Sequence, residues 1–269
     1  MILFPPAKIN LGLHILFKRE DGFHELETVM TTIPFTDILE ILPAESFEFK
    51  QSGIPIPGET STNLCVKAYE LMKLEYNTPP IFIHLKKIIP MGGGLGGGSA
   101  DAAYVLKGIN SLFNLNLSES TLEELASRLG SDCPFFVKNT TQTAKGRGEI
   151  LSQIELDLKG YFLKIINIGL HVGTKEAYAG AQFSTSSKTV SEIISQPIST
   201  WKNELTNDFE KTVFAIYPEL DKVKEDFYSE GAIYAAMSGS GSTMFGIFEK
   251  KPNKTFEDKD EILELILEL

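Results

Sequence analysis

Apolar and polar residues alternate along the first segment of the chain. From Ala7 to Phe17 every odd position is apolar, and most even positions carry a polar side chain or glycine. A period of two is typical of a strand with one buried face. Lys8 and Asn10 therefore leave the same face of the predicted strand. The alternation alone favours two solvated polar positions.

Further periodic segments follow, and they alternate between the two types of secondary structure. Strands are predicted at Phe35–Leu42, Ile81–Lys87 and Phe162–Ile168. Helical spacing of apolar residues predicts helices at Thr62–Leu74, Ala100–Leu112 and Thr121–Leu129. Because strands and helices interleave, the chain belongs to the mixed α and β class.

Two segments carry further helix signals. Before and within the helix at Thr121–Leu129, Ser120 and Glu123 resemble a capping box, and Gly130 is suited to end the helix. The tail Asp258–Leu269 has the spacing of a terminal amphipathic helix.

The chain offers one place for a domain boundary. Around Ser152–Lys159 a glycine-rich portion gives way to a new predicted strand. A Ser/Thr-rich stretch at Phe183–Ser191 predicts a loop within the second half. A length of 269 residues allows one large domain or two of ordinary size.

Composition and charge narrow the function classes. With 42% hydrophobic and 23% charged residues, the chain is in the range of ordinary globular proteins. Its net charge of −11 argues against a nucleic-acid-binding protein, which needs a basic face, but not against a small anionic ligand. Two cysteines, Cys65 and Cys133, argue against a disulfide scaffold. No apolar run approaches the roughly 18 residues of a membrane span, so we expect a cytoplasmic protein.

The strongest chemical signal is the glycine-rich segment Ile89–Ala103, with the sequence IPMGGGLGGGSADAA. Glycine costs chain entropy, so such a cluster usually marks backbone with positive φ or a close approach to a ligand. The segment follows a predicted strand and runs into a helix that starts near Ser99. Open amides at a helix N-terminus bind phosphate, which makes a phosphate site a better explanation than a flexible turn.

Other phosphate-binding and catalytic motifs do not match. The loop lacks the Lys–Ser/Thr ending of a Walker A motif, which excludes a P-loop NTPase. The pattern GxGxxG is present from Gly92 to Gly97, but the acidic residue of a dinucleotide fold would fall near Glu119, at the start of a predicted helix. His24 and Glu25 begin a zincin motif, but position 28 is threonine.

Three segments together resemble the GHMP kinases, a superfamily of small-molecule kinases. They are Pro6–Leu11 (PAKINL), the loop Pro90–Ala103 and Ser238–Thr243 (SGSGST), in that order and at that spacing. The resemblance implies an α+β fold with two domains. These are an N-terminal ATP-binding α/β domain at 1–155 and a C-terminal ferredoxin-like domain at 156–269, with the active site in the cleft between them.

Other segments resemble one branch of this superfamily. They are Arg19–Leu26, Gly92–Gly98, Leu129–Phe136, Gly146–Glu149 and Asn207–Glu210. This branch phosphorylates a cytidine-diphosphate-linked sugar alcohol with ATP, in the non-mevalonate route to isoprenoid precursors. A GHMP kinase of the homoserine or mevalonate type and a catalytically inactive relative are alternatives. The Asp-Gly-Phe-His segment argues against the first, and the presence of both Lys8 and Asp132 argues against the second.

The resemblance implies catalytic roles for Lys8 and Asp132. Asp132 would accept the proton of the substrate hydroxyl, although its position before Pro134 alone indicates a turn residue. Lys8 would lie beside Asp132, keep it ionised and stabilise charge on the transferring phosphoryl group. Asn10 would orient the substrate.

The resemblance also implies how ATP and magnesium bind. The nucleotide would lie on Pro90, Met91, Gly92, Gly93, Gly94, Leu95, Gly96, Gly97, Gly98 and Ser99. Magnesium would bridge the phosphates, and the Ser99 hydroxyl is the one metal contact that the sequence suggests. The third glycine motif consists of Ser238, Gly239, Ser240 and Gly241.

A cytosine site is implied by the segment around Phe23. His24 would hydrogen-bond the cytosine and Phe23 would stack on it, in place of the tyrosine that is usual in this branch. Tyr178 is a candidate for the opposite side of the ring, with core packing as an equally good explanation. We expect small-molecule substrates, no nucleic-acid or membrane partner, and a monomer or homodimer.

Overall fold

The structure, a computed structural model, describes residues 1–253 and 262–269. Its backbone forms two compact units, each discontinuous in sequence. Unit 1 comprises Met1–Lys8, Thr32–Met91 and Gly96–Thr140, and unit 2 comprises Ile9–Thr31, Gly92–Leu95 and Thr141–Leu269. The continuous domains expected at 1–155 and 156–269 divide the chain differently and stay a prediction.

Unit 1 is built on a four-stranded sheet with the order β1-β4-β6-β5. Its strands are β1 (Ile2–Leu3), β4 (Ile38–Pro43), β5 (Glu48–Gly53) and β6 (Ile81–Lys87). β4 pairs antiparallel with β1 and β6, and β5 pairs parallel with β6. The strand predicted at Ile81–Lys87 is confirmed. The strand predicted at Phe35–Leu42 is found as β4, which begins at Ile38 because β3 continues to Thr36.

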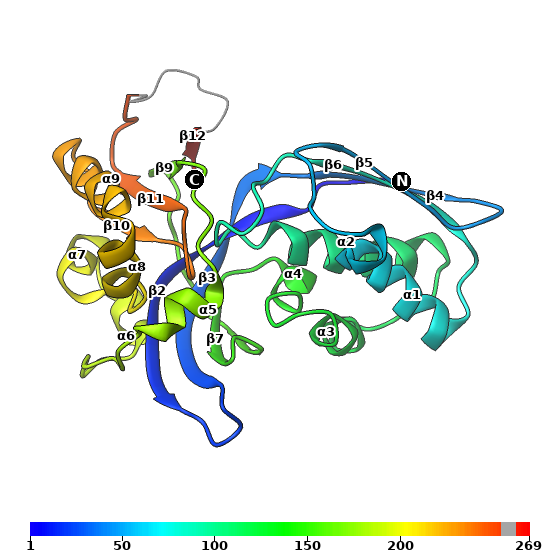
Figure 1. Cartoon of the computed structure of the whole chain (residues 1–269), viewed down its shortest axis with the longest axis horizontal. Helices are drawn as coiled ribbons and strands as arrows, with labels where there is room; N and C mark the ends of the chain where they lie inside the picture. The colour runs from blue at the N-terminus through cyan, green and yellow to red at the C-terminus, as the bar shows by residue number, and fades with distance from the viewer. Residues whose placement is uncertain (254–261) are drawn as a thin grey trace. The chain divides into compact units, whose positions relative to one another are not determined.

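Helices cover this sheet and bury its apolar side chains. They are η1 (Thr60–Thr62), α1 (Leu64–Tyr76), α2 (Gly97–Leu112), α3 (Glu119–Ser127) and α4 (Phe135–Lys138). α2 contacts β4, and α1 packs along α2 (Figure 1). Buried residues with helical spacing, such as Val105 and Ile109 of α2, meet Leu39 and Ile83 of the sheet in one core. The three predicted helices are therefore confirmed, because each has an apolar stripe that this core buries.

The start of α3 differs from the prediction. Its cap is Ser118, whose Oγ accepts a hydrogen bond from the backbone N–H of Thr121 at 3.2 Å. The capping box expected from Ser120 and Glu123 is therefore wrong. Ser118 lies three residues before the amide that it binds, which is the spacing of a capping side chain.

Unit 2 contains most of the sheet β2-β3-β7-β8. Its strands are β2 (Pro6–Lys18), β3 (His24–Thr36), β7 (Gln142–Gly146) and β8 (Ile150–Gln153). The strand predicted at Ala7–Phe17 is confirmed, but the expectation of solvated polar positions on it is wrong. Lys8, Asn10 and His14 are each at most 4% exposed. Buried polar side chains persist where they have hydrogen-bond or ionic partners, which alternation along one strand does not show.

The second sheet of unit 2 is antiparallel throughout, with the order β10-β11-β9-β12. Its strands are β9 (Phe162–Asn167), β10 (Tyr234–Met237), β11 (Met244–Phe248) and β12 (Leu263–Glu268). β9 confirms the strand predicted at Phe162–Ile168. α9 (Pro218–Ser229) packs on β10 and β11, and α8 (Glu210–Ile216) packs on α9 (Figure 1). The remaining helices are α5 (Thr174–Ala179), α6 (Val190–Ile194), η2 (Ile198–Thr200) and α7 (Trp201–Glu204).

The end of the chain is a strand. Leu263–Glu268 pairs with β9 as β12, so the helix predicted at Asp258–Leu269 is wrong over those residues. Residues 258–261 of that prediction lie outside the described residues. The run LELILE fits a strand as well as a helix, and the open edge of β9 decides between them. In the parts of the chain that the structure describes, no helix is long and apolar enough to cross a membrane.

Candidate active site

Lys8 and Asp132 form an ion pair in unit 1. Lys8 lies near the start of β2. Asp132 lies in the turn between α3 and α4, where the amide of Cys133 donates to the carbonyl of Gly130 at 3.1 Å. Lys8 Nζ is 3.4 Å from Asp132 Oδ2, and the two side chains are 4% and 37% exposed. The pair therefore joins a buried ammonium to a carboxylate that a ligand can reach.

The second half of the glycine loop lies beside this pair. Gly96 has a φ of +69°, and a Cβ on it would lie 2.8 Å from Phe136 Cζ and 3.0 Å from Lys8 Cγ. Only glycine fits here, because the backbone passes directly over the Lys8 side chain. α2 begins at the next residue, Gly97. The open amides of its first turn thus follow immediately after the contact with Lys8.

The first half of the glycine loop packs on the third glycine motif, within unit 2. Ser238 Oγ donates to the carbonyl of Gly94 at 2.8 Å, and the amide of Thr243 donates to the carbonyl of Gly93 at 3.2 Å. A Cβ on Gly94 would lie 2.0 Å from the Ser238 carbonyl oxygen. A Cβ on Gly93 would lie 2.7 Å from both Thr243 Oγ1 and Asn167 Nδ2. Gly94 is required for close packing of backbone on backbone, and Gly93 for close packing of backbone on two side chains.

Asn10 lies at the third glycine motif. Its backbone N–H donates to Ser238 Oγ at 3.2 Å, and its side-chain amide donates to Thr28 Oγ1 at 3.1 Å. Asn207 holds the same motif through its side-chain amide, which donates to the carbonyls of Met237 and Gly239 at 2.8 Å each. Sequence patterns gave no signal for Thr28, because an isolated threonine within a strand is common.

An aromatic cluster occupies another part of unit 2. The rings of His24 and Tyr178 stack with centroids 4.8 Å apart and an interplanar angle of 20°. The Phe183 ring lies 6.4 Å from His24. Phe23 is 52% exposed, and the guanidinium carbon of Arg147 is 4.9 Å from its ring centroid. The structure thus brings Tyr178 to His24 and adds Phe183, which the sequence placed only at the edge of a polar loop.

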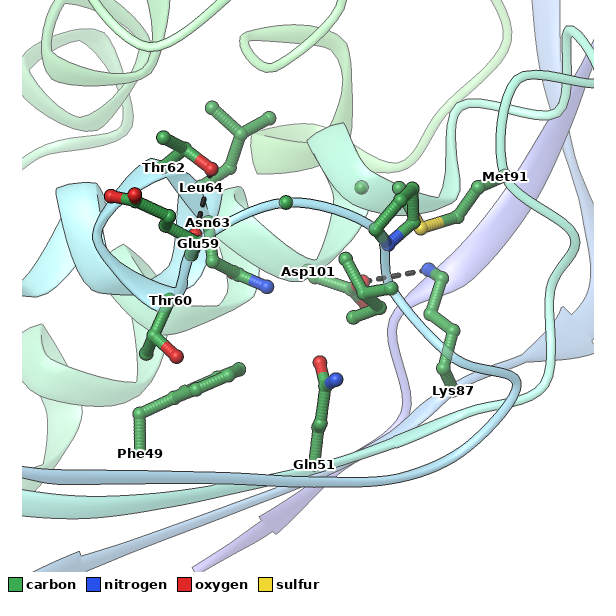
Figure 2. Close-up of a pocket in the computed structure, with 14 residues that line it drawn as sticks. Phe49, Gln51, Glu59, Thr60, Thr62, Asn63, Leu64, Lys87, Met91 and Asp101 are labelled. Carbon is green, nitrogen blue, oxygen red and sulfur yellow. Dashed lines mark hydrogen bonds and ion pairs between the residues drawn. The ribbon is translucent and has the colours of Figure 1, made fainter.

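A pocket of about 150 Å³ lies in unit 1 at the start of α2 (Figure 2). Its wall combines five apolar side chains with seven polar or charged ones and two glycines. It is lined by Phe49, Gln51, Ile56, Pro57, Gly58, Glu59, Thr60, Thr62, Asn63, Leu64, Lys87, Met91, Gly98 and Asp101. Met91 and Gly98 belong to the glycine loop, so the pocket adjoins the predicted phosphate site. A pocket with both apolar and polar side chains beside an anion-binding helix terminus suits a nucleoside that carries phosphates.

The side chains available for a metal are few. Within residues 1–253 and 262–269, no group of three or more histidine, cysteine, aspartate or glutamate side chains could hold a metal ion. Ser99, the third residue of α2, offers a hydroxyl that hydrogen-bonds the Cys133 side chain, and burial raises the pKa of that thiol to about 12. Magnesium carried by substrate phosphates needs only one or two protein oxygens. The donor set therefore fits magnesium bound through a nucleotide.

Two family models, curated relatives and a solved structure are similar to this chain. Residues 63–139 match the family model described as GHMP kinases N terminal domain, and residues 189–265 match GHMP kinases C terminal. The 4-diphosphocytidyl-2-C-methyl-D-erythritol kinase of Azobacteroides pseudotrichonymphae is 50% identical over 259 residues, 95% of this chain and 97% of that protein. Its namesake from Cytophaga hutchinsonii is 48% identical over 270 residues, covering 100% of both chains. A crystal structure of 4-(cytidine 5'-diphospho)-2C-methyl-D-erythritol kinase has a TM-score of 0.79 at 33% identity, covering 92% of this chain and 90% of that one.

Proposed function

The chain belongs to the GHMP kinase family, and we propose that it phosphorylates the 2-hydroxyl of 4-diphosphocytidyl-2-C-methyl-D-erythritol with ATP, in the non-mevalonate route to isoprenoid precursors. Its fold is the two-domain GHMP kinase fold of mixed α and β content, and it is a phosphotransferase. The observation that carries the proposed chemistry is the Lys8–Asp132 ion pair beside Gly96.

Asp132 and Lys8 have different roles in phosphoryl transfer: Asp132 accepts a proton, and Lys8 offsets negative charge. The substrate hydroxyl gives its proton to the Asp132 carboxylate as its oxygen bonds to the γ-phosphorus of ATP. The bond between that phosphorus and the bridging oxygen breaks, and ADP leaves with the electron pair. Lys8 lies next to the reacting groups and offsets the negative charge on the transferring phosphoryl oxygens. The 37% exposure of Asp132 supports direct contact with the substrate.

The pocket beside α2 takes the nucleoside of ATP, and the glycine loop takes its phosphates. The loop runs from Pro90 to Gly98, and Gly98 lines the pocket. The nucleoside and the phosphates at the open amides of α2 therefore bind at adjoining surfaces of unit 1. Ser99 would hold magnesium, which would neutralise negative charge on the phosphates.

The aromatic cluster of unit 2 recognises the cytosine of the acceptor. Phe23 is exposed and stacks on the base through the ring face that Arg147 does not cover, and the neighbouring His24 hydrogen-bonds the polar edge of that base. Tyr178 stacks on His24 and also packs against the core of unit 2, which fixes the orientation of the imidazole. Asn10 orients the sugar alcohol from the third glycine motif.

A substrate panel tests the function. The purified protein is assayed for ADP release with ATP, magnesium and one of three acceptors: 4-diphosphocytidyl-2-C-methyl-D-erythritol, homoserine or mevalonate. We expect turnover with the first acceptor alone, because homoserine and mevalonate would leave the polar groups of a cytosine site unpaired. Turnover of homoserine or mevalonate at an equal rate would assign the chain to another kinase of the family. A ligand-dependent rise in melting temperature without any turnover would indicate an inactive relative.

A further inference from the structure

Three charged side chains of unit 1 form a buried cluster that the proposed reaction does not use. Lys87 ends β6, Asp37 immediately precedes β4, and Asp101 lies in the first part of α2. Their side chains are at most 3% exposed. Lys87 Nζ lies 2.5 Å from Asp37 Oδ2 and 2.7 Å from Asp101 Oδ2. Figure 2 shows the Lys87–Asp101 bond at the wall of the pocket.

Asp37 binds the chain where it leaves β6. Its Oδ1 accepts hydrogen bonds from the backbone N–H groups of Ile88 and Ile89 at 2.5 and 2.9 Å. Its Oδ2 accepts from Lys87. Ile88 and Ile89 immediately precede Pro90, the first residue of the glycine loop. The entry to the loop is therefore bonded to a carboxylate that is itself paired with a buried ammonium.

The same ammonium contacts the other end of the loop. Asp101 Oδ2 accepts from Lys87, whereas Asp101 Oδ1 has no hydrogen-bond partner among the described residues. Gly97 is the first residue of α2, and a Cβ on it would lie 2.8 Å from Lys87 Nζ. Lys87 thus touches the start of α2 and bonds to the helix about one turn later. The two ends of the glycine loop are therefore connected through the Lys87 ammonium, directly at Gly97 and through Asp37 at Ile88 and Ile89.

Stability alone is a weak reason for such a cluster. Burying three charges is costly, and well-packed apolar residues of similar volume are often at least as stabilising. Hydrogen bonds to charged groups do what apolar contacts cannot, because they fix direction as well as distance. An anion site built from backbone amides depends on the direction in which the N–H groups point.

We propose that Lys87, Asp37 and Asp101 are positioning residues that hold the two ends of the glycine loop, so that its amides are aimed at nucleotide phosphates. Lys87 and Asp101 also line the pocket that takes the nucleoside, but their charged atoms bond to each other, so the cluster acts mainly on the phosphate end of the ligand. This role rests on the proposed function, since it takes ATP as the ligand.

The variant Asp101→Ala distinguishes an effect on phosphate binding from an effect on nucleoside binding. It removes one bond of the cluster and leaves the Lys87–Asp37 pair intact, so no charge is left buried without a partner. We expect the dissociation constant of a non-hydrolysable ATP analogue to rise at least tenfold. The dissociation constant of adenosine, which lacks phosphates, should rise by a clearly smaller factor, although Asp101 lines the nucleoside pocket.

Val105→Ala is the matched control, because Val105 is a fully buried residue of α2 whose truncation lowers stability without removing a hydrogen bond of the cluster. An equal loss of affinity for adenosine and for the ATP analogue would overturn the proposal. The proposal would also be overturned if Asp101→Ala bound the ATP analogue as tightly as Val105→Ala does, or more tightly. If Asp101→Ala does not fold, Asp101→Asn replaces it, with a rise of at least threefold for the analogue expected and no change overturning the proposal.

Amide hydrogen exchange in the ligand-free protein gives a second readout. The amides of residues 92–98 should exchange at least tenfold faster in Asp101→Ala than in Val105→Ala, because the loop has lost one anchor. Equal exchange in the two variants would contradict the positioning role. This measurement needs no nucleotide, so failure of the wild-type protein to bind the ATP analogue would count against the proposed function and leave exchange to decide on the cluster.

Discussion

The ammonium of Lys8 and the carboxylate of Asp132 lie 3.4 Å apart, and they differ sharply in exposure, with 4% for the lysine side chain and 37% for the aspartate. A buried cation next to an accessible carboxylate is an asymmetric pair. The carboxylate can meet the hydroxyl of an incoming substrate, while the ammonium stays within the protein. Both residues should therefore be needed for turnover, Asp132 as the group that accepts a proton and Lys8 as the nearby charge.

Asp132→Asn should nearly abolish turnover. The amide keeps the size of the carboxylate but cannot accept a proton, and general base catalysis typically contributes 10²–10⁴-fold. The loss corresponds to about 3–5 kcal/mol of barrier. Affinity for the ATP analogue should stay close to that of the wild-type protein. The control is Asp157→Asn on the exposed surface, and turnover of Asp132→Asn within a few-fold of this control would exclude Asp132 as the base.

Lys8→Met should also lower turnover, by roughly 10²-fold or more, because charge on the transferring phosphoryl group loses its nearest cation. Methionine has a similar length, so it fills the buried site beside Gly96. The fold should persist, as checked by circular dichroism. If the Michaelis constants rise while kcat is unchanged, Lys8 contributes to ground-state binding alone.

Two neighbouring glycines should respond differently to valine. A Cβ on Gly97 would lie 2.8 Å from Lys87 Nζ and 2.9 Å from Ile89 Cγ2. Gly97→Val should therefore lower the free energy of unfolding, by about 1–3 kcal/mol, as well as ATP affinity. A Cβ on Gly98 meets no described atom within 4 Å, and Gly98 lines the pocket. Gly98→Val should keep the stability of the wild-type protein and weaken ATP binding about tenfold.

Chemical denaturation and nucleotide titration of both variants check this prediction. Gly98→Val that binds ATP as tightly as the wild-type protein would mean that the nucleotide does not lie on this part of the loop. Gly97→Val with unchanged stability would show that Lys87 and Ile89 can move away from the added side chain.

Phe23→Ala and His24→Ala should each raise the Michaelis constant for the cytidine-containing acceptor by 10- to 100-fold. Stacking of a base on an aromatic ring contributes about 1–3 kcal/mol, and 1.4 kcal/mol corresponds to tenfold. The constant for ATP should change little. Phe17→Ala is a matched control, since Phe17 is 53% exposed and Phe23 is 52% exposed. Equal kinetics for Phe23→Ala and Phe17→Ala would argue against stacking on Phe23.

Stability should depend on pH through Asp101. Burial, with Asp37 nearby, raises the pKa of Asp101 from its ordinary value of 3.8 to about 7 in the folded protein, against the opposing effect of Lys87. The folded state thus favours the protonated form, so this contribution to stability is complete below about pH 4 and is lost as pH rises to 7. Cys65 also faces the cluster, but burial raises the pKa of its thiol well above its ordinary value.

Asp101→Asn lacks this titration. Between pH 4 and pH 8, its free energy of unfolding should increase relative to that of the wild-type protein, as measured by urea denaturation at several pH values. Parallel curves for the two proteins would show that Asp101 keeps the same pKa in the folded and unfolded states.

Local sequence patterns were sufficient to predict an element where the segment's own residues decide its structure. The strand at Ile81–Lys87 and the helix α2 follow from spacing alone, because each has an apolar face that a core must bury. The glycine loop could also be located from the sequence, since so many glycines between a strand and a helix have few other uses. The family resemblance then added Lys8 and Asp132 to the predicted site, since no periodicity identifies these two residues as functional.

Tertiary structure decided what depends on segments far apart in the chain. Lys8 and Asn10 looked solvated in the sequence but are buried, because their partners come from elsewhere in the chain. The run at Leu263–Glu268 became a strand because β9 offered it a pairing edge.

The sequence by itself determined several of the strands and helices, the position of the glycine loop and the motifs that mark a kinase, because each of these is written in adjacent residues. Only the tertiary structure gathered residues 49–64 with the start of α2 into a pocket, and joined Lys87 to Asp37 and Asp101. Burial is a property of the surroundings of a side chain and not of its neighbours in sequence. A charged residue therefore shows its partner only after the chain has folded.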